Sequence, residues 1–236
     1  MSKIVNQIAV LSIHIPKTGG SSFQNTLMDA YGQSAFLRLD FTVQKRLGIP
    51  RIVATNRTSQ ASIDEIIEQG KLNDQIKIVH GHFHYSEFIQ FFELSTEAKV
   101  ITWLRDPIDR IVSNYNYLVS ILDHDLDHTP RSREVLKRML KSLPEFSRIP
   151  RDIALYSDYL SGQDLADYDF IGIVEDYDNE LKRLGKILGA RELPTHHVNK
   201  TERKLILPTA TEEQEITQLH EQNQRIYQRA KVLKGG

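Results

Sequence analysis

Short apolar runs alternate with stretches of helical spacing along this chain. In the first run, at 4–15, eight of the twelve residues are apolar. Near-continuous runs of this kind are typical of parallel strands that are covered on both faces. Three further runs, at 75–80, 99–104 and 170–174, predict additional strands.

Apolar residues at helical spacing predict helices between and after these strands. The predicted helices span 23–30, 56–70, 107 to about 119, 132–143, 177–188 and 211–233. Pro107 stands where a helix can begin, and Thr209 or Thr211 is a suitable cap for the last helix. Strands that alternate with helices predict an α/β fold with three α/β/α layers around a central parallel sheet.

The chain shows no internal repeat and no low-complexity linker, so we expect a single domain over 1–236. The segment at about 123–160 is interpreted as a helical insertion in that domain. Within it, residues 131–151 include seven basic and two acidic residues. This basic stretch is either a solvated helix face or a surface for an anionic acceptor or carrier protein.

Composition excludes several classes of protein. The 30 basic and 31 acidic residues give a net charge of −1, which argues against general nucleic-acid binding. The lack of cysteine excludes disulfides, thiolate metal sites and a cysteine nucleophile. No apolar run approaches the roughly 18 residues of a membrane helix, and the N-terminus lacks a signal-peptide pattern. We therefore expect a cytoplasmic protein.

The loop after the first strand has the residues of an anion site. Backbone N–H groups and the helix dipole favour anions at a helix start. Glycines let a ligand approach the backbone, Lys17 adds charge, and hydroxyls add hydrogen bonds. The residues concerned are Lys17, Thr18, Gly19, Gly20, Ser21 and Ser22. The loop is not a Walker A motif, because Lys17 precedes the glycines. The alternative is an ordinary turn with an exposed lysine.

A second candidate motif follows the strand at 99–104. Arg105 lies at the carboxyl end of that strand, where open parallel sheets bind ligands, and its guanidinium can grip a phosphate. Ser113 comes about two helical turns later and can reach the same group. Asp106 either orients Arg105 or caps the helix. The alternative is a helix start with an Arg–Asp surface pair.

Together the two motifs resemble those of sulfotransferases. Lys-Thr-Gly-Gly-Ser-Ser-Phe, at 17–23, resembles their 5′-phosphosulfate-binding loop, and Arg-Asp-Pro-x-x-Arg-x-x-Ser-x-Tyr, at 105–115, resembles their 3′-phosphate-binding motif. The pattern is most similar to heparan sulfate and uronyl 2-O-sulfotransferases and their bacterial relatives. The resemblance runs from about 10 to 207, with gaps.

The resemblance implies a P-loop nucleotide-hydrolase-like sulfotransferase fold. It also implies 3′-phosphoadenosine 5′-phosphosulfate (PAPS) as donor and 3′-phosphoadenosine 5′-phosphate (PAP) as product. No strand ends in the aspartate of a Walker B metal site. A transferring sulfonate carries less negative charge than a phosphate, so we expect that no metal is required.

Three histidines, His80, His82 and His84, alternate after the strand at 75–80, which places them on one face if the chain is extended. They can form a metal site, serve in the core, or supply a general base. The resemblance implies that His82, the second residue of a His-Gly-His element, is the catalytic base and that His80 supports it. His84 has no counterpart there.

Other polar residues have alternative roles or roles that only the resemblance implies. His124 and His128 have metal-like spacing, although a solvated turn is the more ordinary reading. Glu175 either orients a basic residue or binds an acceptor hydroxyl. The resemblance implies that Lys200 and Thr201 contact the donor. His14 is expected to pack beneath the first loop.

The sequence thus predicts an enzyme that moves a sulfonate from PAPS to a hydroxyl of a carbohydrate or of a glycosylated or carrier-bound small molecule. In-line attack is implied, with Lys17 stabilising the leaving group. The absence of cysteine and of a membrane anchor favours a bacterial member of the family. The alternatives are a nucleotide kinase with a degenerate P-loop and a non-catalytic nucleotide-binding protein.

Overall fold

The computed structural model describes residues 3–40, 44–46, 49–51, 70–124, 142–190, 192–197 and 205–235. The chain divides into two compact units. The first comprises Met1–Leu104 and Asp158–Asn199, and the second comprises Arg105–Ser157 and Lys200–Gly236. The expectation of a single domain stays a prediction.

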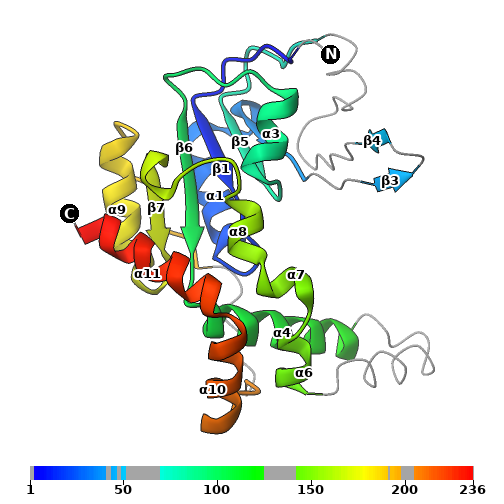
Figure 1. The fold of residues 1–236 in the computed structure, drawn as a ribbon. Helices are drawn as coiled ribbons and strands as arrows, with labels where there is room; N and C mark the ends of the chain where they lie inside the picture. The colour runs from blue at the N-terminus through cyan, green and yellow to red at the C-terminus, as the bar shows by residue number, and fades with distance from the viewer. Residues whose placement is uncertain are drawn as a thin grey trace. The chain divides into compact units, whose positions relative to one another are not determined.

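The first unit is built on a parallel sheet of five strands (Figure 1). Their order is β2 (Phe36–Arg38), β5 (Ile78–Gly81), β1 (Val10–Ile13), β6 (Lys99–Leu104) and β7 (Phe170–Ile173). Ile13 in the central strand pairs with Gly81 of β5 and with Thr102 of β6. This sheet confirms the predicted α/β fold. A separate antiparallel pair joins β3 (Gln44–Arg46) to β4 (Ile49–Arg51).

Both faces of the sheet are covered, since every residue of β1, β5 and β7 is buried. Helices α1 (Gly20–Tyr31) and α9 (Tyr177–Ile187) cover one face through Phe23, Leu27, Leu181 and Leu184. Trp103 lies in this core, with its ring 5.2 Å from that of Phe23.

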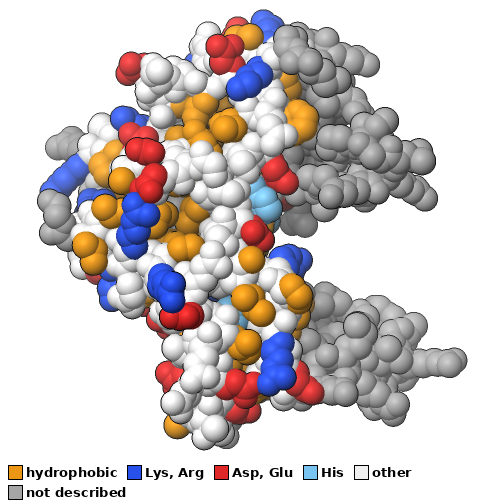
Figure 2. Space-filling model, viewed as in Figure 1, with side chains coloured by type: hydrophobic (Ala, Val, Ile, Leu, Met, Phe, Trp, Pro, Cys, Tyr) orange, Lys and Arg blue, Asp and Glu red, His pale blue; other side chains and the backbone are white. Residues whose placement is uncertain are grey.

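The other described elements of this unit are short. They are α3 (Tyr85–Phe91) and the 3-10 turns η1 (Gln33–Ala35), η2 (Leu165–Asp167) and η3 (Val174–Asp176). Basic, acidic and apolar side chains are interspersed over the described surface drawn in Figure 2, in keeping with the near-neutral net charge.

The second unit is helical. Its elements are α4 (Pro107–His124), α6 (Leu143–Ser147), α7 (Pro150–Ile153), the first residues of α8 (Leu155–Tyr159), α10 (Ala210–Leu219) and α11 (Glu221–Gly235). The core of this unit joins α4, α6 and α10. It consists of Ile111, Val112, Tyr115, Leu143, Phe146 and Ile216. Of the helices in the described ranges, none is long and apolar enough to span a bilayer.

Element boundaries were predicted with mixed success. Strand β6 and the start of α4 at Pro107 agree with the prediction. The first strand is shorter than predicted, because β1 begins only at Val10, while Ile4 and Val5 form single bridges. Strand β2 was missed. The predicted helix at 56–70 lies outside the described residues except for its last, and that at 132–143 except for its last two.

The prediction of a single last helix over 211–233 was wrong. Two helices stand there, α10 and α11, and Thr209 caps α10 by accepting the Glu212 N–H. The break falls at His220, whose side chain is fully buried. Its Nε2 lies 2.8 Å from the Ser147 carbonyl oxygen. The helix is therefore interrupted at a residue whose side chain makes a buried contact, although the helical spacing of the sequence continues through it.

Candidate active site

The loop between β1 and α1 turns through two left-handed residues. Lys17 has φ of 71° and Gly19 has φ of 78°. The first N–H bonded back within the helix start is that of Phe23, which donates to the Gly19 carbonyl at 3.1 Å. The preceding N–H groups therefore have no acceptor in the helix itself. Left-handed residues next to a helix start form a concave set of donors that suits an anion.

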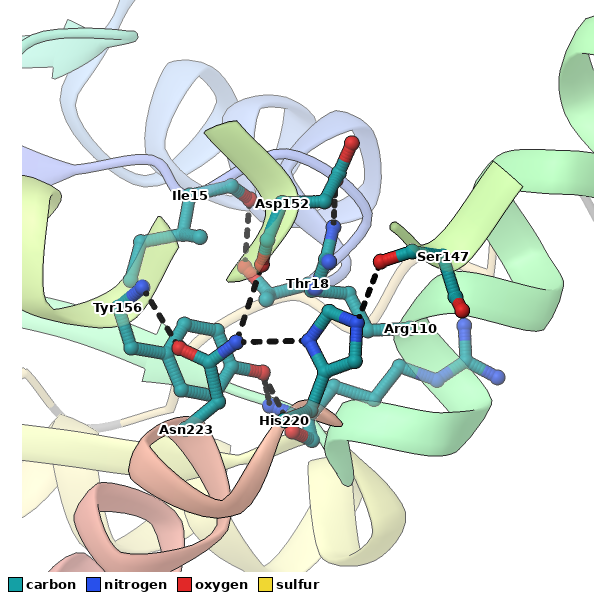
Figure 3. Close-up of polar contacts among 9 residues, drawn as sticks. Ile15, Thr18, Arg110, Ser147, Asp152, Tyr156, His220 and Asn223 are labelled. Atoms are coloured by element: carbon teal, nitrogen blue, oxygen red, sulfur yellow. Dashed lines mark hydrogen bonds and ion pairs between the residues drawn. The ribbon is translucent and has the colours of Figure 1, made fainter. Parts of the chain in front are cut away.

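Lys17 is a non-glycine residue in a conformation that costs energy, and such strain concentrates at functional sites. Thr18 has a different part, because its buried hydroxyl donates to the Ile15 carbonyl at 2.8 Å and closes the loop (Figure 3). Ser21 is exposed and Ser22 is buried. The sequence motif is thus divided between residues that shape the loop and residues at its surface.

Gly20 is required by the ring of His14. A Cβ atom at residue 20 would lie 1.8 Å from His14 Nε2. His14 therefore packs beneath the loop, as predicted, and its burial lowers its pKa.

His14 also joins a cluster of histidines with His80 and His82. Its ring stacks on His82 at 4.2 Å and on His80 at 5.1 Å between centroids. His80 is anchored in β5, where its Nδ1 lies 2.9 Å from Ser12 Oγ. His84 has another place, preceding α3 and packing edge-on against the Tyr159 ring at 4.8 Å. Two of the three predicted histidines, His80 and His82, therefore cluster around His14, which follows β1.

His82 is held by two hydrogen bonds. Its Nδ1 lies 2.7 Å from the His14 carbonyl oxygen, and its backbone N–H donates to Asp40 Oδ1 at 2.9 Å. Asp40 in turn pairs with Arg38 at 3.0 Å. Arg38 also donates to Gln24 Oε1 at 2.5 Å, which ties the pair to α1.

Sequence reasoning missed Arg38, Asp40 and Gln24. A signal was present in the run Phe-Leu-Arg-Leu-Asp at 36–40, where polar residues follow an apolar start, as they do at the ends of the other strands. The close approach of this segment also explains Gly81. A Cβ atom there would lie 1.9 Å from the Leu39 carbonyl oxygen.

Burial dominates the titration of this cluster. It lowers the pKa of His80 to about 3, and it lowers that of His82, although the charge of Asp40 and the bond to His14 act in the opposite direction. Burial tends to raise the pKa of Asp40, but its bonds from Arg38 and from the His82 N–H outweigh that effect and lower it. The ring of His82 is therefore neutral near pH 7.

The second motif begins directly after β6. Asp106 caps α4, because its Oδ1 accepts the N–H groups of Ile108 at 2.9 Å and Asp109 at 3.3 Å. Arg110 is fully buried and pairs with Asp152 at 3.0 Å. Arg105 and Ser113, the predicted ligands of the 3′-phosphate, are both partly exposed. The motif thus combines two residues that build the helix with two that reach the surface.

Several predicted residues lie outside the described ranges. These are Lys200, Thr201, His128 and the side chain of His124. Of the basic stretch at 131–151, residues 131–141 also lie outside them, while Arg148 pairs with Glu215. Glu175 is exposed in η3, directly after β7. Within the described ranges, His, Asp and Glu side chains form no group of three or more that could hold a metal ion.

Two solved structures are similar to this chain at low sequence identity. Mouse sulfotransferase SULT7A1 complexed with PAP has 11% identity and a TM-score of 0.47, over 99% of this chain and 90% of that one. A sulfotransferase from Alicyclobacillus acidocaldarius has 14% identity and a TM-score of 0.43, over 92% of each chain. No curated protein matches the sequence.

The assignment to a family rests on a match to the sequence itself. The model of the sulfotransferase family matches residues 3–234. Because this match covers nearly the whole chain, the protein belongs to the sulfotransferase family, whose members are enzymes that transfer a sulfonate group.

Proposed function

We propose that this chain transfers a sulfonate from PAPS to an acceptor hydroxyl, with His82 as the general base. The observation that carries the proposal is the bond between His82 Nδ1 and the His14 carbonyl oxygen at 2.7 Å. A carbonyl only accepts hydrogen bonds, so a neutral His82 carries its proton on Nδ1. The lone pair of Nε2 is then the basic site of the ring.

The same bond ties the base to the anion-binding loop. His14 is the first residue after β1, and its carbonyl oxygen orients His82 at the end of the neighbouring strand β5. Carboxyl ends of adjacent parallel strands are where ligands bind in sheets of this kind. A donor held at the start of α1 therefore has its reacting group on the same edge of the sheet as His82.

The loop suits the phosphosulfate end of the donor. The helix start and the left-handed turn supply backbone donors, and Lys17 supplies a full positive charge. We propose that residues 17–22 bind this group and that Lys17 stabilises the negative charge that develops on the leaving phosphate oxygen. Thr18 contributes by shaping the loop through its bond to Ile15.

The proposed step is balanced without a further reactant. The acceptor oxygen attacks the sulfur while His82 Nε2 takes the hydroxyl proton. The bond between sulfur and the bridging phosphate oxygen breaks, and PAP leaves with the electron pair. His80 supports His82 from within β5, where its neutral ring is fixed by Ser12.

For the other end of the donor, we propose that Arg105 and Ser113 hold the 3′-phosphate. Arg105 can form a bidentate contact, and Ser113 lies about two turns along α4 from it. Lys200 and Thr201 remain part of the proposal on the sequence resemblance alone. The proposed acceptor is a carbohydrate or a glycosylated or carrier-bound small molecule.

The test is a transfer assay with ³⁵S-labelled PAPS over a panel of hydroxyl-bearing carbohydrates, combined with titration of PAP. His82→Ala is expected to bind PAP as the wild type does and to lose transfer by 10²-fold or more, on the order of a general base's contribution. The matched control is His196→Ala, because His196 pairs with Asp29 near the other end of α1.

Two results would contradict the proposal. Retained turnover in His82→Ala would remove the base assignment. Mg²⁺-dependent turnover of ATP, without transfer from PAPS, would favour a kinase instead.

A further inference from the structure

The backbone of Arg105 is clamped by a single side chain. The Tyr156 hydroxyl donates to the Arg105 carbonyl oxygen at 2.5 Å and accepts the Arg105 N–H at 3.3 Å. Tyr156 is labelled in Figure 3, beside Asn223 and His220. Tyr156 is fully buried. Because one hydroxyl holds both backbone polar groups of the same residue, it fixes the direction in which the Arg105 side chain leaves the chain.

Tyr156 is itself fixed by Asn223 of α11. Its N–H donates to Asn223 Oδ1 at 3.2 Å, and Asn223 Nδ2 donates to the Asp152 carbonyl oxygen at 3.0 Å. Asn223 is fully buried. One amide therefore ties the segment that carries Tyr156 to the C-terminal helix.

His220 determines the orientation of that amide. Its Nε2 lies 2.8 Å from the Ser147 carbonyl oxygen, so Nε2 carries the proton. Burial lowers the pKa of His220, which keeps the ring neutral and leaves Nδ1 as an acceptor. Asn223 Nδ2 lies 3.1 Å from this Nδ1 and therefore donates to it. The Asn223 oxygen is then directed to Tyr156.

A second anchor holds the same segment to α4. The buried pair of Arg110 and Asp152 joins the first turn of α4 to α7, which directly precedes α8 and Tyr156. Asp106, the residue after Arg105, caps α4. Arg105 is thus fixed on its own backbone by Tyr156 and on its C-terminal side by a helix that is tied to the same segment.

We propose that Tyr156 is a positioning residue for recognition of the donor's 3′-phosphate, acting through Arg105, with Asn223 holding Tyr156 in place. The inference rests on the proposed role of Arg105. It predicts that the Tyr156 hydroxyl contributes to the affinity for nucleotides that carry a 3′-phosphate, and not to the affinity for those that lack one.

The experiment compares the dissociation constants of PAP and of adenosine 5′-phosphate, which lacks the 3′-phosphate. Tyr156→Phe is expected to weaken the binding of PAP about fivefold, the size of a typical net hydrogen-bond contribution. The dissociation constant of adenosine 5′-phosphate should change by no more than about twofold. The matched control is Tyr227→Phe, a buried tyrosine one turn after Asn223 on α11, which should leave both constants unchanged.

A double-mutant cycle separates this inference from the proposed function. If Tyr156 acts through Arg105, Tyr156→Phe has no further effect on PAP binding in an Arg105→Ala background. If Arg105→Ala alone leaves the preference for PAP intact, the proposed role of Arg105 is wrong, and the inference falls with it. If Arg105→Ala abolishes the preference and Tyr156→Phe does not reduce it, only the inference is wrong.

Binding of adenosine 5′-phosphate also reports whether a variant is folded. Should Tyr156→Phe bind neither nucleotide, Asn223→Ser provides the second test. This change removes the amide that supports Tyr156 but keeps the Tyr156 hydroxyl. Asn223→Ser is expected to weaken the binding of PAP more than the binding of adenosine 5′-phosphate. An equal loss for both nucleotides in this variant would overturn the proposal.

Discussion

The Asp40 carboxylate accepts the His82 backbone N–H at 2.9 Å, and its charge is the main influence that raises the pKa of the His82 ring. Burial acts more strongly in the other direction, so the pKa of His82 lies below its ordinary value of 6.5. Asp40 thus holds the proposed base in place and offsets part of the cost of charging it.

The position of the acidic limb of the pH–rate profile tests this relationship. A histidine acts as a general base in its neutral form. The rate should therefore decline only at a pH below that at which an exposed histidine becomes protonated. In Asp40→Asn the amide oxygen can still accept the His82 N–H, but the negative charge is gone. The pKa of His82 then falls further, and the acidic limb of kcat/KM should move to lower pH.

The control for this variant is Asp29→Asn. It removes a carboxylate of α1 that pairs with His196. Its profile should coincide with that of the wild type. An acidic limb that moves to higher pH in Asp40→Asn would show that the electrostatic relationship between Asp40 and His82 has been misassigned.

Gly20 provides a test of the loop's construction. A methyl group at this position would overlap the His14 ring, at 1.8 Å from Nε2, in a tightly packed site. Overpacking of this kind typically costs about 1–3 kcal/mol. Gly20→Ala is therefore expected to lower the free energy of unfolding by that amount and to displace His14, whose carbonyl orients His82. Urea denaturation followed by the fluorescence of Trp103, the only tryptophan, measures the change.

Gly185 in α9 is the matched control, because a Cβ atom there meets its nearest neighbour at an ordinary 3.6 Å. Alanine is favoured over glycine inside a helix by about 0.5–1 kcal/mol. Gly185→Ala should therefore stabilise the protein. A Gly20→Ala variant as stable as the wild type would mean that the His14 ring can move away from residue 20 at no cost in stability.

Local signals in the sequence were sufficient for the elements that carry the second motif. The run at 99–104 and Pro107 predict β6 and the start of α4, because both depend on residues next to each other in the chain. By contrast, β2 has only Phe36, Leu37 and Arg38, and it pairs with residues of β5 that lie 42 positions further along the chain. Such a short strand carries too few residues for a period to be recognised.

The candidate site was also predictable only in part. Lys17 and His82 could be named from motifs, whereas Asp40 and Tyr156 act on the backbone groups of other residues. The run at 36–40 marks Asp40 as a polar residue at a strand end, but the sequence does not show which backbone group either residue contacts. Thr18 and Arg110 belong to the motifs, yet their side chains are buried in structural bonds. A motif shows which residues occur together, and the structure distinguishes those that build the site from those at its surface.

The buried histidines predict a loss of stability in acid. The pKa of His80 is about 3 in the folded protein, against 6.5 for an exposed histidine. The unfolded chain therefore binds a proton that the folded one does not, and stability falls as the pH drops from 6.5 and levels off near 3. This group alone should cost about 2 kcal/mol between pH 6.5 and 5. His80→Asn should reduce the pH dependence of the unfolding free energy, and an unchanged slope would contradict the assignment.

The buried pair of Arg110 and Asp152 should show a strong asymmetry between single and double variants. Both side chains are almost fully buried, so Asp152→Ala leaves an unpaired charge inside the second unit. Loss of one partner of a buried pair costs about 3–5 kcal/mol, whereas apolar replacement of both is often nearly neutral. Asp152→Ala should therefore be much less stable than the wild type, and Arg110→Met combined with Asp152→Leu should recover most of the loss.

The exposed pair of Glu221 and Arg225 in the same unit is the control, since exposed pairs contribute at most about 1 kcal/mol. Glu221→Ala should change the unfolding free energy by no more than that. Urea denaturation followed by circular dichroism gives all three values. If Asp152→Ala were no more costly than Glu221→Ala, Arg110 would have another buried partner or access to water.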